Sequence, residues 1–399
     1  MKFDMFYEFQ KAKPWPQEHE RQVIEESLAQ ARAADEAGFE IWWQVEHHAT
    51  PEFSYSAAPE ILLTAVALNT KRMHVGHAGV LAPFKINHPL RVAERIATMD
   101  ILSGGRMELG LAKSGGKEWE TFGVNPETAR EEVREAAQMI PRMWTDDVFS
   151  WNSDLLTIPP REVTPRPLQR PHPRIWQTAG SPDSFRMAGE LGLGVLGTTL
   201  LSSVAQMRSL LDEYEAGLAN AKPAGKFVTD QKGIFTFVHV AESRKKAIES
   251  GAAWSALWYV NAAAVALKVP RRVWYDTIRN GLHPNSPGDT AALKGADPTI
   301  LEIDPNDPPV VVTLKRMAMG ENISFEEAHE VLEPLDSVIV GDVDFCAKKF
   351  ANYESIGSDR MMCLMQYGTI AHPDVLRSIE LTGEHLIPAF AGTAQRKRA

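Results

Sequence analysis

The stretch that decides the fold is Phe39–His48, FEIWWQVEHH, an apolar run that ends in an acid and two histidines. Its length, and the Thr50-Pro51 pair that closes it, predict a buried parallel strand. Glu46, His47 and His48 would then lie at the carboxyl end of that strand. In a chain of alternating strands and helices, the loops at this end surround a common mouth, where catalytic side chains collect. The alternative is a strand that simply ends in polar residues where it meets solvent.

Strands and helices alternate on both sides of this stretch. Eight segments predict strands, and helical sequence follows each of them: residues 2–7, 39–48, 73–82, 106–113, 174–178, 195–198, 234–240 and 360–365. Eight such units predict an α/β fold, a (β/α)8 TIM barrel, that forms a single domain over residues 1–399. A doubly wound sheet is the competing fold, and a second domain would need a linker that the sequence does not contain.

Two segments depart from the alternation. Residues 151–173 are rich in proline and predict an excursion at the barrel rim that could cover a site. Residues 269–334, before the last strand, contain Pro284, Pro287 and the run Asp304–Pro309. A stretch of this length without a regular period predicts an insertion that acts as a lid or carries substrate determinants. By contrast, helical sequence is expected from 243 to about 266.

Composition excludes several classes of protein. The net charge of -10 and the pI near 5.7 argue against a nucleic-acid partner, whose phosphates need a basic face. Cys346 and Cys363 are too few and too far apart for a disulfide framework or a zinc site, which fits a reducing cytoplasm. The first residues do not resemble a signal peptide, and no apolar run reaches about 18 residues, so we expect a cytoplasmic protein without a membrane span.

A dinucleotide fingerprint occurs in the wrong place. Gly192, Gly194 and Gly197 match its spacing formally. They follow a predicted helix and enter a strand, whereas the phosphate-binding turn must leave a strand and open a helix. We therefore do not expect a nicotinamide cofactor to bind there.

Two predicted helix starts have the residues of an anion site. Gly180 allows close approach of the backbone, Ser181 suits the N-cap and Pro182 suits the first helical position. Free amides at such an end can hold a phosphate, although an ordinary capped helix has the same residues. Arg130 lies near a second helix start, where a cation opposes the helix dipole unless it holds an anion. Lys113, at the end of the fourth strand, would add a positive charge at the same rim.

Several motifs, taken in order and spacing over nearly the whole chain, resemble the bacterial luciferase-like flavin monooxygenases. They are the opening Met-Lys-Phe strand, Gly38-Phe39 with Glu46-His47-His48, the run from His88 to Glu94, Ser103-Gly104-Gly105-Arg106, Phe122-Gly123 with Arg130, and Val340-Gly341-Asp342.

The resemblance implies a barrel that binds reduced FMN and dioxygen at its mouth, usually as a homodimer or a higher homo-oligomer. A separate flavin reductase supplies the reduced FMN. Such an enzyme oxygenates a small organic substrate through a flavin hydroperoxide, and an aldehyde or ketone is favoured here. Aromatic residues expected near the mouth permit an apolar substrate, although most would belong to the core: Trp42, Trp43, Phe84, Trp176 and Trp258.

The resemblance also assigns roles to residues. His47 corresponds to the histidine thought to act as the catalytic base, and Glu46 and His48 flank it. Glu46 would orient the His47 ring or raise its basicity. The remaining positions are expected to contact the cofactor. They are Lys113, Arg130, Gly180, Ser181 and Ser184 at the FMN phosphate, with lysine in place of an arginine, Ala78-Gly79 as a non-proline cis peptide beneath the flavin, and Ala112 in place of a reactive cysteine.

Three alternatives remain open at this point. A deazaflavin (F420)-dependent dehydrogenase could use the same barrel for hydride transfer without oxygen. A hydrolase could hold a metal with Glu46-His47-His48, although the triplet lacks the helical spacing of metalloprotease ligands, and no metal site is expected. A non-catalytic relative could bind flavin without turnover.

Overall fold

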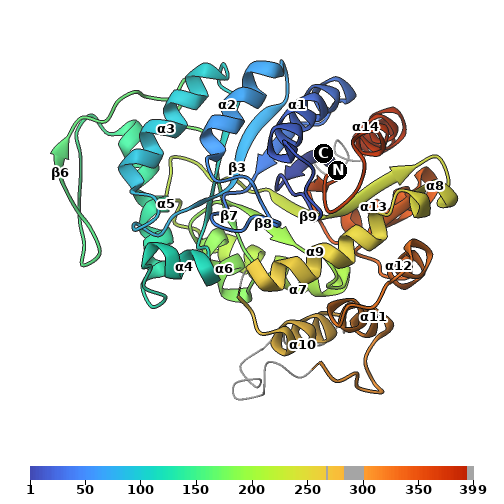
Figure 1. The fold of residues 1–399 in the computed structure, drawn as a ribbon. Helices are drawn as coiled ribbons and strands as arrows, with labels where there is room; N and C mark the ends of the chain where they lie inside the picture. The colour runs from blue at the N-terminus through green and yellow to red at the C-terminus, as the bar shows by residue number, and fades with distance from the viewer. Residues whose placement is uncertain (267, 283–300, 393–399) are drawn as a thin grey trace.

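The computed structural model describes residues 1–266, 268–282 and 301–392. Its centre is a barrel of parallel strands (Figure 1). Eight strands form the ring in chain order: β1 (Lys2–Tyr7), β2 (Ile41–Gln44), β3 (His74–Leu81), β4 (Met107–Ala112), β7 (Ile175–Thr178), β8 (Gly194–Thr198), β9 (Lys232–Ala241) and β11 (Arg360–Leu364). The ring closes because β8 pairs with β9, and β11 pairs with both β9 and β1. The predicted (β/α)8 barrel is confirmed.

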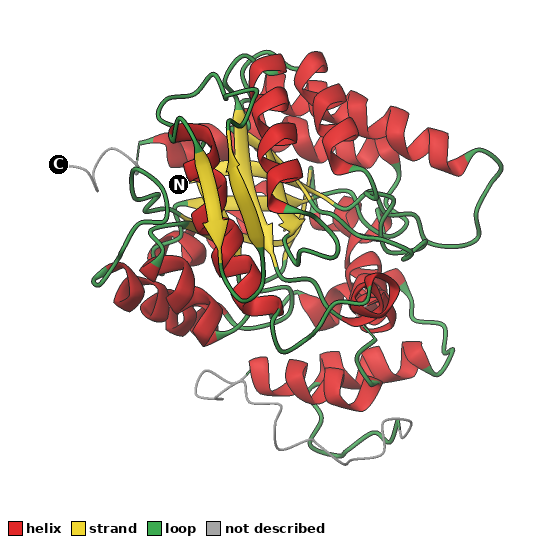
Figure 2. Cartoon of the chain, turned by 90° about the vertical axis from the view of Figure 1, so that its left-hand side faces the viewer, coloured by secondary structure: helices red, strands yellow, loops and turns green. Residues whose placement is uncertain are grey.

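Helices surround the strands, as Figure 2 shows. The outer layer consists of α1 (His19–Ala37), α2 (Pro59–Asn69), α3 (Pro89–Leu102), α5 (Ala129–Thr145), α6 (Pro182–Glu190), α7 (Val204–Leu218), α13 (Val343–Ser355) and α14 (His372–Leu381). After α14 the chain continues through a π-helical turn, η2 (Thr382–Leu386), into α15 (Ile387–Ala391). A short strand, β10 (Ile339–Asp342), pairs with β9 beside the ring. Within the described ranges, no helix combines the length and apolar character that crossing a membrane requires.

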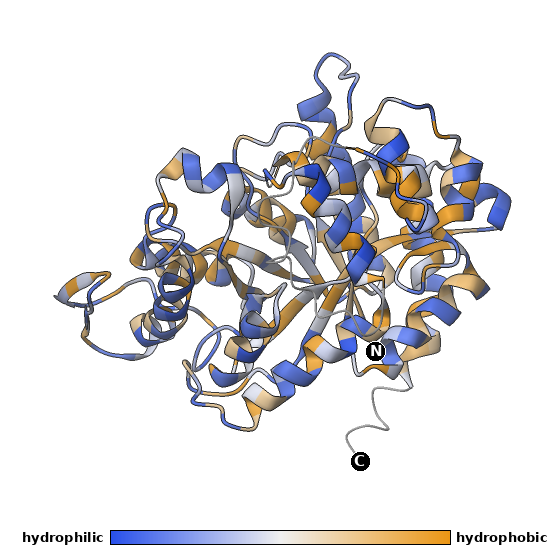
Figure 3. Cartoon of the chain, turned by 90° about the horizontal axis from the view of Figure 1, so that it is seen from below, coloured by the Kyte–Doolittle hydropathy of each residue, from blue (hydrophilic) through white to orange (hydrophobic). Residues whose placement is uncertain are grey.

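The stretch that decides the fold forms β2 at the centre of the core. Trp42 and Trp43 are both fully buried, because one side of a barrel strand faces the interior and the other faces the helices. Trp42 stacks on Tyr7 of β1, and the Trp43 indole donates a hydrogen bond to Asp4 at 2.9 Å. Arg360 of β11 closes this part of the core with two hydrogen bonds to Asp4, at 2.7 and 2.8 Å. Figure 3 shows hydrophobic residues concentrated along the central strands.

The helical sequence from 243 to 266 is divided in two. α8 (Arg244–Glu249) ends and α9 (Ala252–Ala266) begins around Gly251, so the stretch predicted to be helical forms two helices. Gly251 has a φ of +68°, a conformation that side chains with a Cβ rarely adopt. A Cβ there would also lie 2.7 Å from the Phe325 ring, so contact with a later helix reinforces the break.

The proline-rich segment is partly a β-hairpin. β5 (Phe149–Asn152) and β6 (Thr157–Arg161) pair antiparallel and form a separate two-stranded sheet. The hairpin extends away from the barrel at the left of Figure 1. Its residues, all of which the structure describes, do not line the cavities at the barrel mouth reported below. The expectation that this segment covers a site therefore finds no support.

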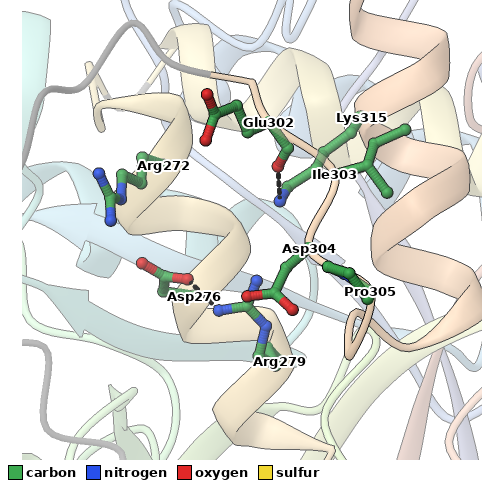
Figure 4. Close-up of a pocket in the computed structure, with 8 residues that line it drawn as sticks. All are labelled: Arg272, Asp276, Arg279, Glu302, Ile303, Asp304, Pro305 and Lys315. Carbon is green, nitrogen blue, oxygen red and sulfur yellow. Dashed lines mark hydrogen bonds and ion pairs between the residues drawn. The ribbon is translucent and has the colours of Figure 1, made fainter.

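The insertion before the last strand contains helices. They are α10 (Arg271–Gly281), α11 (Pro309–Ala318) and α12 (Phe325–Leu332), whereas the predicted turn residues Pro284 and Pro287 lie outside the described part of the chain. Buried charges join α10 to α11. Asp307, whose side chain is fully buried, accepts hydrogen bonds from Arg279 at 2.9 Å and Lys315 at 2.7 Å. Figure 4 shows Arg279 and Lys315 in this cluster, where Lys315 also donates to the Glu302 carbonyl oxygen at 2.6 Å.

Candidate active site

His47 lies just beyond β2, at the mouth formed by the carboxyl ends of the strands. Its imidazole is about one-fifth exposed, and its ring packs edge-on against Phe53 with centroids 5.3 Å apart. The Nδ1 atom lies 3.1 Å from Oε1 of Glu118, which belongs to α4 (Gly116–Phe122). Sequence analysis did not predict this short helix, which follows a glycine-containing loop.

Glu118 is built to remain a carboxylate. It accepts hydrogen bonds from the His48 backbone N–H at 2.9 Å and from the Ser114 hydroxyl. Burial works to raise the pKa of Glu118, but the hydrogen bond from His47 and these two donors outweigh it and lower the pKa. An ionised Glu118 accepts a hydrogen bond from the Nδ1–H group of His47, so the Nε2 atom is left to face the mouth.

Of the two predicted effects of Glu46 on His47, orientation of the ring finds no support, because Glu46 contacts His48 instead. Burial works to lower the pKa of His47, and Glu46 joins Glu118 and Glu8 in raising it, as the other prediction held. Residues two apart on an extended chain point to the same side, so Glu46 and His48 face one way and His47 the other. Glu46 instead lies 3.1 Å from Nε2 of His48. It also accepts hydrogen bonds from the Leu81 backbone N–H at 2.8 Å and the Asn87 amide at 2.9 Å. Glu46 therefore ties the end of β2 to the end of β3.

The residues predicted to hold a phosphate come together in one cavity. Lys113 follows β4 directly, Arg130 is the second residue of α5, and the other three belong to the loop and first turn of α6. The cavity has a volume of about 260 Å³, and its lining includes Lys113, Arg130, Gly180, Ser181 and Ser184. Burial and the neighbouring Arg130 guanidinium lower the pKa of Lys113. Two cations and a helix N-terminus make this a cationic pocket on an acidic protein.

The start of α6 explains how the two serines contribute. Ser181 is the N-cap and forms a capping box with Ser184. The backbone N–H groups of Gly180 and Ser181 both donate to the Ser184 hydroxyl, at 3.2 and 3.0 Å. Arg130 pairs with Asp183 at 2.9 Å, and both side chains are substantially exposed. Such a pair contributes little stability, so the guanidinium can turn to another anion at small cost.

The peptide between Ala78 and Gly79 on β3 is cis, as predicted. A Cβ at Gly79 would lie 2.9 Å from the backbone of Gly110 on β4, so this position needs glycine. Ala112, the position at which the resemblance places a reactive cysteine in other members, is the last residue of β4 and lies directly before Lys113.

A larger cavity of about 690 Å³ adjoins the same loop. Gly180 and Ser181 line one end of it, and the insertion contributes Trp274 and Ile278 of α10. Leu201, after β8, and Val260, on α9, make other parts of the wall apolar. The predicted insertion thus lines a cavity next to the cationic pocket. Of the aromatic residues considered for the mouth, Trp42, Trp43 and Trp176 are fully buried in the core.

Among the described residues, several buried polar atoms at the carboxyl ends of the strands have no hydrogen-bond partner. Most buried polar groups in a folded protein are hydrogen-bonded, so each exception needs an explanation. Those near the mouth are Gln10 Nε2 and Oε1, Gln177 Oε1, Thr178 Oγ1, Thr198 Oγ1 and the Tyr367 hydroxyl. A cofactor or substrate with N–H and C=O groups would satisfy such atoms.

Sequence reasoning missed three polar residues near His47. They are Glu118, Glu8 directly after β1, and Tyr259 on α9, whose hydroxyl donates to Glu8 Oε1 at 2.7 Å. Of the three, only Glu118, which follows the glycine-containing loop, gave a local signal. That signal was weak, because an acid in a first helical turn is common for other reasons. Over the described ranges, no group of three or more His, Cys, Asp and Glu side chains is arranged to hold a metal ion.

These features define a class of protein. It is a parallel eight-stranded barrel whose mouth combines a cationic pocket with a histidine held by a carboxylate. The model of the family described as luciferase-like monooxygenase matches residues 1–302. The chain therefore belongs to the luciferase-like oxidoreductases, a family that includes flavin monooxygenases and F420-dependent dehydrogenases.

Individual relatives are distant. The oxygenase component of flavin-dependent trigonelline monooxygenase from Acinetobacter baylyi is 29% identical over 219 residues, 54% of this chain and 59% of that protein. The F420-dependent glucose-6-phosphate dehydrogenase of Amycolatopsis mediterranei is 28% identical over 56% of this chain and 68% of its own length. The match to the trigonelline enzyme thus spans less than two thirds of that relative.

A solved structure shows the same fold over nearly the whole chain. The monooxygenase RslO1 from Streptomyces bottropensis superposes with a TM-score of 0.74, covering 98% of this chain and 100% of that one. Its identity to this chain is 23%.

Proposed function

We propose that this protein is the oxygenase component of a two-component monooxygenase that uses reduced FMN and dioxygen. The observation that carries the proposal is the convergence of Lys113, Arg130 and the start of α6 on one small pocket. A phosphate monoester, which carries close to two negative charges near neutral pH, matches two cations and a helix N-terminus. Reorientation of the Ser184 hydroxyl would free the amides of Gly180 and Ser181 for its oxygens.

The rest of the mouth fits the flavin ring. The unpartnered atoms of Gln10, Gln177, Thr178, Thr198 and Tyr367 include both donors and acceptors, as the polar edge of an isoalloxazine requires. We infer that Ala78-Gly79 and Ala112, on neighbouring strands, lie under the ring. When bound, reduced flavin activates dioxygen, and that chemistry belongs to the cofactor rather than to the chain.

The chain would contribute binding, orientation and proton transfer. His47, held at Nδ1 by Glu118, presents Nε2 to the mouth, where an imidazole can take or give a proton near neutral pH. His48 and Glu46 would maintain the loop that carries it. The apolar wall formed by Leu201, Val260 and Ile278 favours a small apolar substrate, such as an aldehyde or ketone, and excludes water.

The proposed source of reduced FMN is a separate flavin reductase. The glycine fingerprint at Gly192 leads from α6 into β8, so it lacks the strand-to-helix order of a nicotinamide site. The trigonelline relative is itself named as an oxygenase component, which supports the same division of labour.

We infer a homodimer formed through α2 and α3. α2 packs against α3 on the outside of the barrel, and four of their large apolar side chains are exposed: Ile61 at 68%, Leu68 at 67%, Ile101 at 46% and Leu102 at 50%. Soluble monomers rarely expose so many neighbouring apolar side chains, so a second copy of the chain would cover them.

Anaerobic titration with reduced FMN, followed by rapid mixing with oxygen and candidate aldehydes and ketones, tests the proposal. Tight binding of reduced FMN and oxygen-dependent formation of an oxygenated product are expected. The second candidate is an F420-dependent dehydrogenase, since one relative carries that name. Tight binding of F420, with substrate oxidation that consumes no oxygen, would replace the monooxygenase by that candidate. Flavin binding without turnover would indicate a non-catalytic relative.

A further inference from the structure

We propose that Glu8 is a positioning residue that sets the protonation state of His47 from the side opposite Glu118. The inference rests on the proposed role of His47 in proton transfer. Glu8 follows β1 directly, and its side chain is only 3% exposed. Its Oε2 atom lies 4.0 Å from Nε2 of His47, so the two groups interact through charge rather than through a formed hydrogen bond.

The environment of Glu8 is unfavourable for a carboxylate. Its Oε1 atom accepts one hydrogen bond, from the Tyr259 hydroxyl at 2.7 Å. Its Oε2 atom is buried and has no hydrogen-bond partner among the described residues. A buried, half-satisfied carboxyl group lowers the stability of a fold, so a functional reason for its presence is expected. The group that Oε2 approaches is the imidazole of His47.

His47 is thus flanked by a carboxylate at each ring nitrogen. Glu118 from α4 contacts Nδ1, and Glu8 from β1 faces Nε2. Glu46, from its own loop, adds a more distant negative charge, and Tyr259 of α9 reaches His47 only through Glu8. Glu118 accepts hydrogen bonds from three donors, one of them the Nδ1–H group of His47, and remains a carboxylate. Glu8 is therefore the group whose negative charge can stabilise a proton bound at Nε2.

The electrostatics of the two groups agree with this arrangement. Burial raises the pKa of Glu8, although His47 and the Tyr259 hydroxyl oppose the rise. Burial works to lower the pKa of His47, but Glu118 and Glu8 outweigh it and raise the pKa. Both pKa values are thus raised: burial favours the neutral form of Glu8, and the neighbouring carboxylates favour the protonated form of His47. A proton that His47 takes up at Nε2 would thus be stabilised by the ionised form of Glu8.

Nuclear magnetic resonance of the full chain labelled with 13C at the histidine Cε1 atoms tests this inference without any substrate. A His47→Gln variant assigns the His47 resonance. In Glu8→Gln, removal of the nearby negative charge should lower the pH midpoint of that resonance by about 1 pH unit. Tyr259→Phe keeps the ring packing but removes the hydrogen bond to Glu8, so Glu8 ionises less readily and the His47 midpoint should fall by a smaller amount.

A matched control is Tyr214→Phe. Tyr214 is also buried, but its hydroxyl donates to the Leu193 carbonyl oxygen at 2.8 Å on the outer side of the barrel. This variant should leave the His47 midpoint unchanged. An unchanged midpoint in both Glu8→Gln and Tyr259→Phe would overturn the inference, and the second variant provides the test if the first fails to fold.

Activity provides the second readout. In Glu8→Gln, the limb of the kcat/KM profile that reports His47 should move to lower pH by the same amount as the resonance. If the resonance moves but the wild type turns over no substrate with reduced FMN or F420, the role of Glu8 stands and the proposed function fails. If the wild type is active and the resonance does not move, the role of Glu8 fails alone.

Discussion

Arg130 is the residue whose role is easiest to isolate, because it is half-exposed and pairs only weakly with Asp183. If it holds the FMN phosphate, Arg130→Ala should weaken binding of reduced FMN about tenfold, through loss of a charge-assisted hydrogen bond. Binding of riboflavin, which lacks the phosphate, should not change. Fluorescence titration with both ligands measures the difference.

The control for this prediction lies one turn further along α5. Arg134 is also partly exposed and pairs with Glu131 and Glu190, outside the residues that line the cationic pocket. Arg134→Ala should leave both affinities unchanged. Equal losses of FMN and riboflavin binding in Arg130→Ala would show that the Arg130 guanidinium does not contact the phosphate.

His47 should matter for turnover and not for cofactor binding. Its imidazole lies at the mouth between Glu118 and Glu8, and it is absent from the lining of the cationic pocket. We expect His47→Ala to lower kcat about 100-fold, as removal of a general acid or base commonly does. The affinity for reduced FMN should remain that of the wild type. Stopped-flow turnover at saturating reduced FMN measures the effect.

An exposed histidine far from His47 in the sequence serves as the control for His47→Ala. His385, in the π-helical turn near the end of the described chain, is about half-exposed. His385→Ala should retain full activity. Wild-type turnover by His47→Ala at saturating reduced FMN would remove His47 from the mechanism.

At the scale of elements, the insertion depends on a buried charge cluster. Asp307 joins Arg279 of α10 to Lys315 of α11, and its side chain is inaccessible to solvent. Asp307→Ala removes the carboxylate partner of Lys315 and leaves Arg279 paired with Asp276 alone, so it should destabilise the protein by about 2 kcal/mol at pH 7. Chemical denaturation measures the loss.

The pH dependence of this effect has a defined sign. Burial works to raise the pKa of Asp307, but hydrogen bonds from Lys315 and Arg279 outweigh it and lower the pKa. The contribution of Asp307 is therefore present above the pKa of the unfolded chain, about 3.9, and is lost as pH falls through the lower folded value. The difference between wild type and Asp307→Ala should shrink in acid. Glu302→Ala, which keeps the carbonyl oxygen bound by Lys315, should cost little at any pH.

The elements also show where sequence patterns suffice. Most strands and helices with strong local signals were predicted within about two residues, as for β1, whose bounds match, and α3, which begins at Pro89 after the His88 cap. The exception is β2, which was predicted to end at His48 but ends at Gln44. The break at Gly251 was missed because Phe325, which packs on it, is distant in the sequence. The hairpin at residues 149–161 was missed because its prolines favour a loop, although edge strands tolerate them.

For the whole molecule, the outstanding prediction concerns the α2–α3 face. Leu68→Lys places a charge among the exposed apolar side chains of that face and should convert the proposed dimer to monomers. Light scattering after size-exclusion chromatography measures the mass. Met319→Lys, at a 48% exposed position of the insertion, is the matched control and should remain dimeric. A monomeric wild type would show that the face has another role.

Sequence patterns were enough to predict the barrel, the position of His47 at its mouth and the residues of the cationic pocket. Each depends on a local signal: apolar strands of the right length, polar residues at strand ends, and the serine, proline and glycine of a capped helix. Because all the strands are parallel, their carboxyl ends must meet, so residues at those ends converge without further information.

The groups that surround His47 could be identified only from the folded structure. Glu118 lies 71 residues from His47, and Glu8 and Tyr259 are separated by 251 residues. Parallel pairing places β1 next to β2, and packing of α9 and α4 over the mouth fixes the last few ångströms. Hydrogen bonds and charge interactions depend on distances of this size, whereas sequence periodicity specifies only the side of a strand that a residue faces.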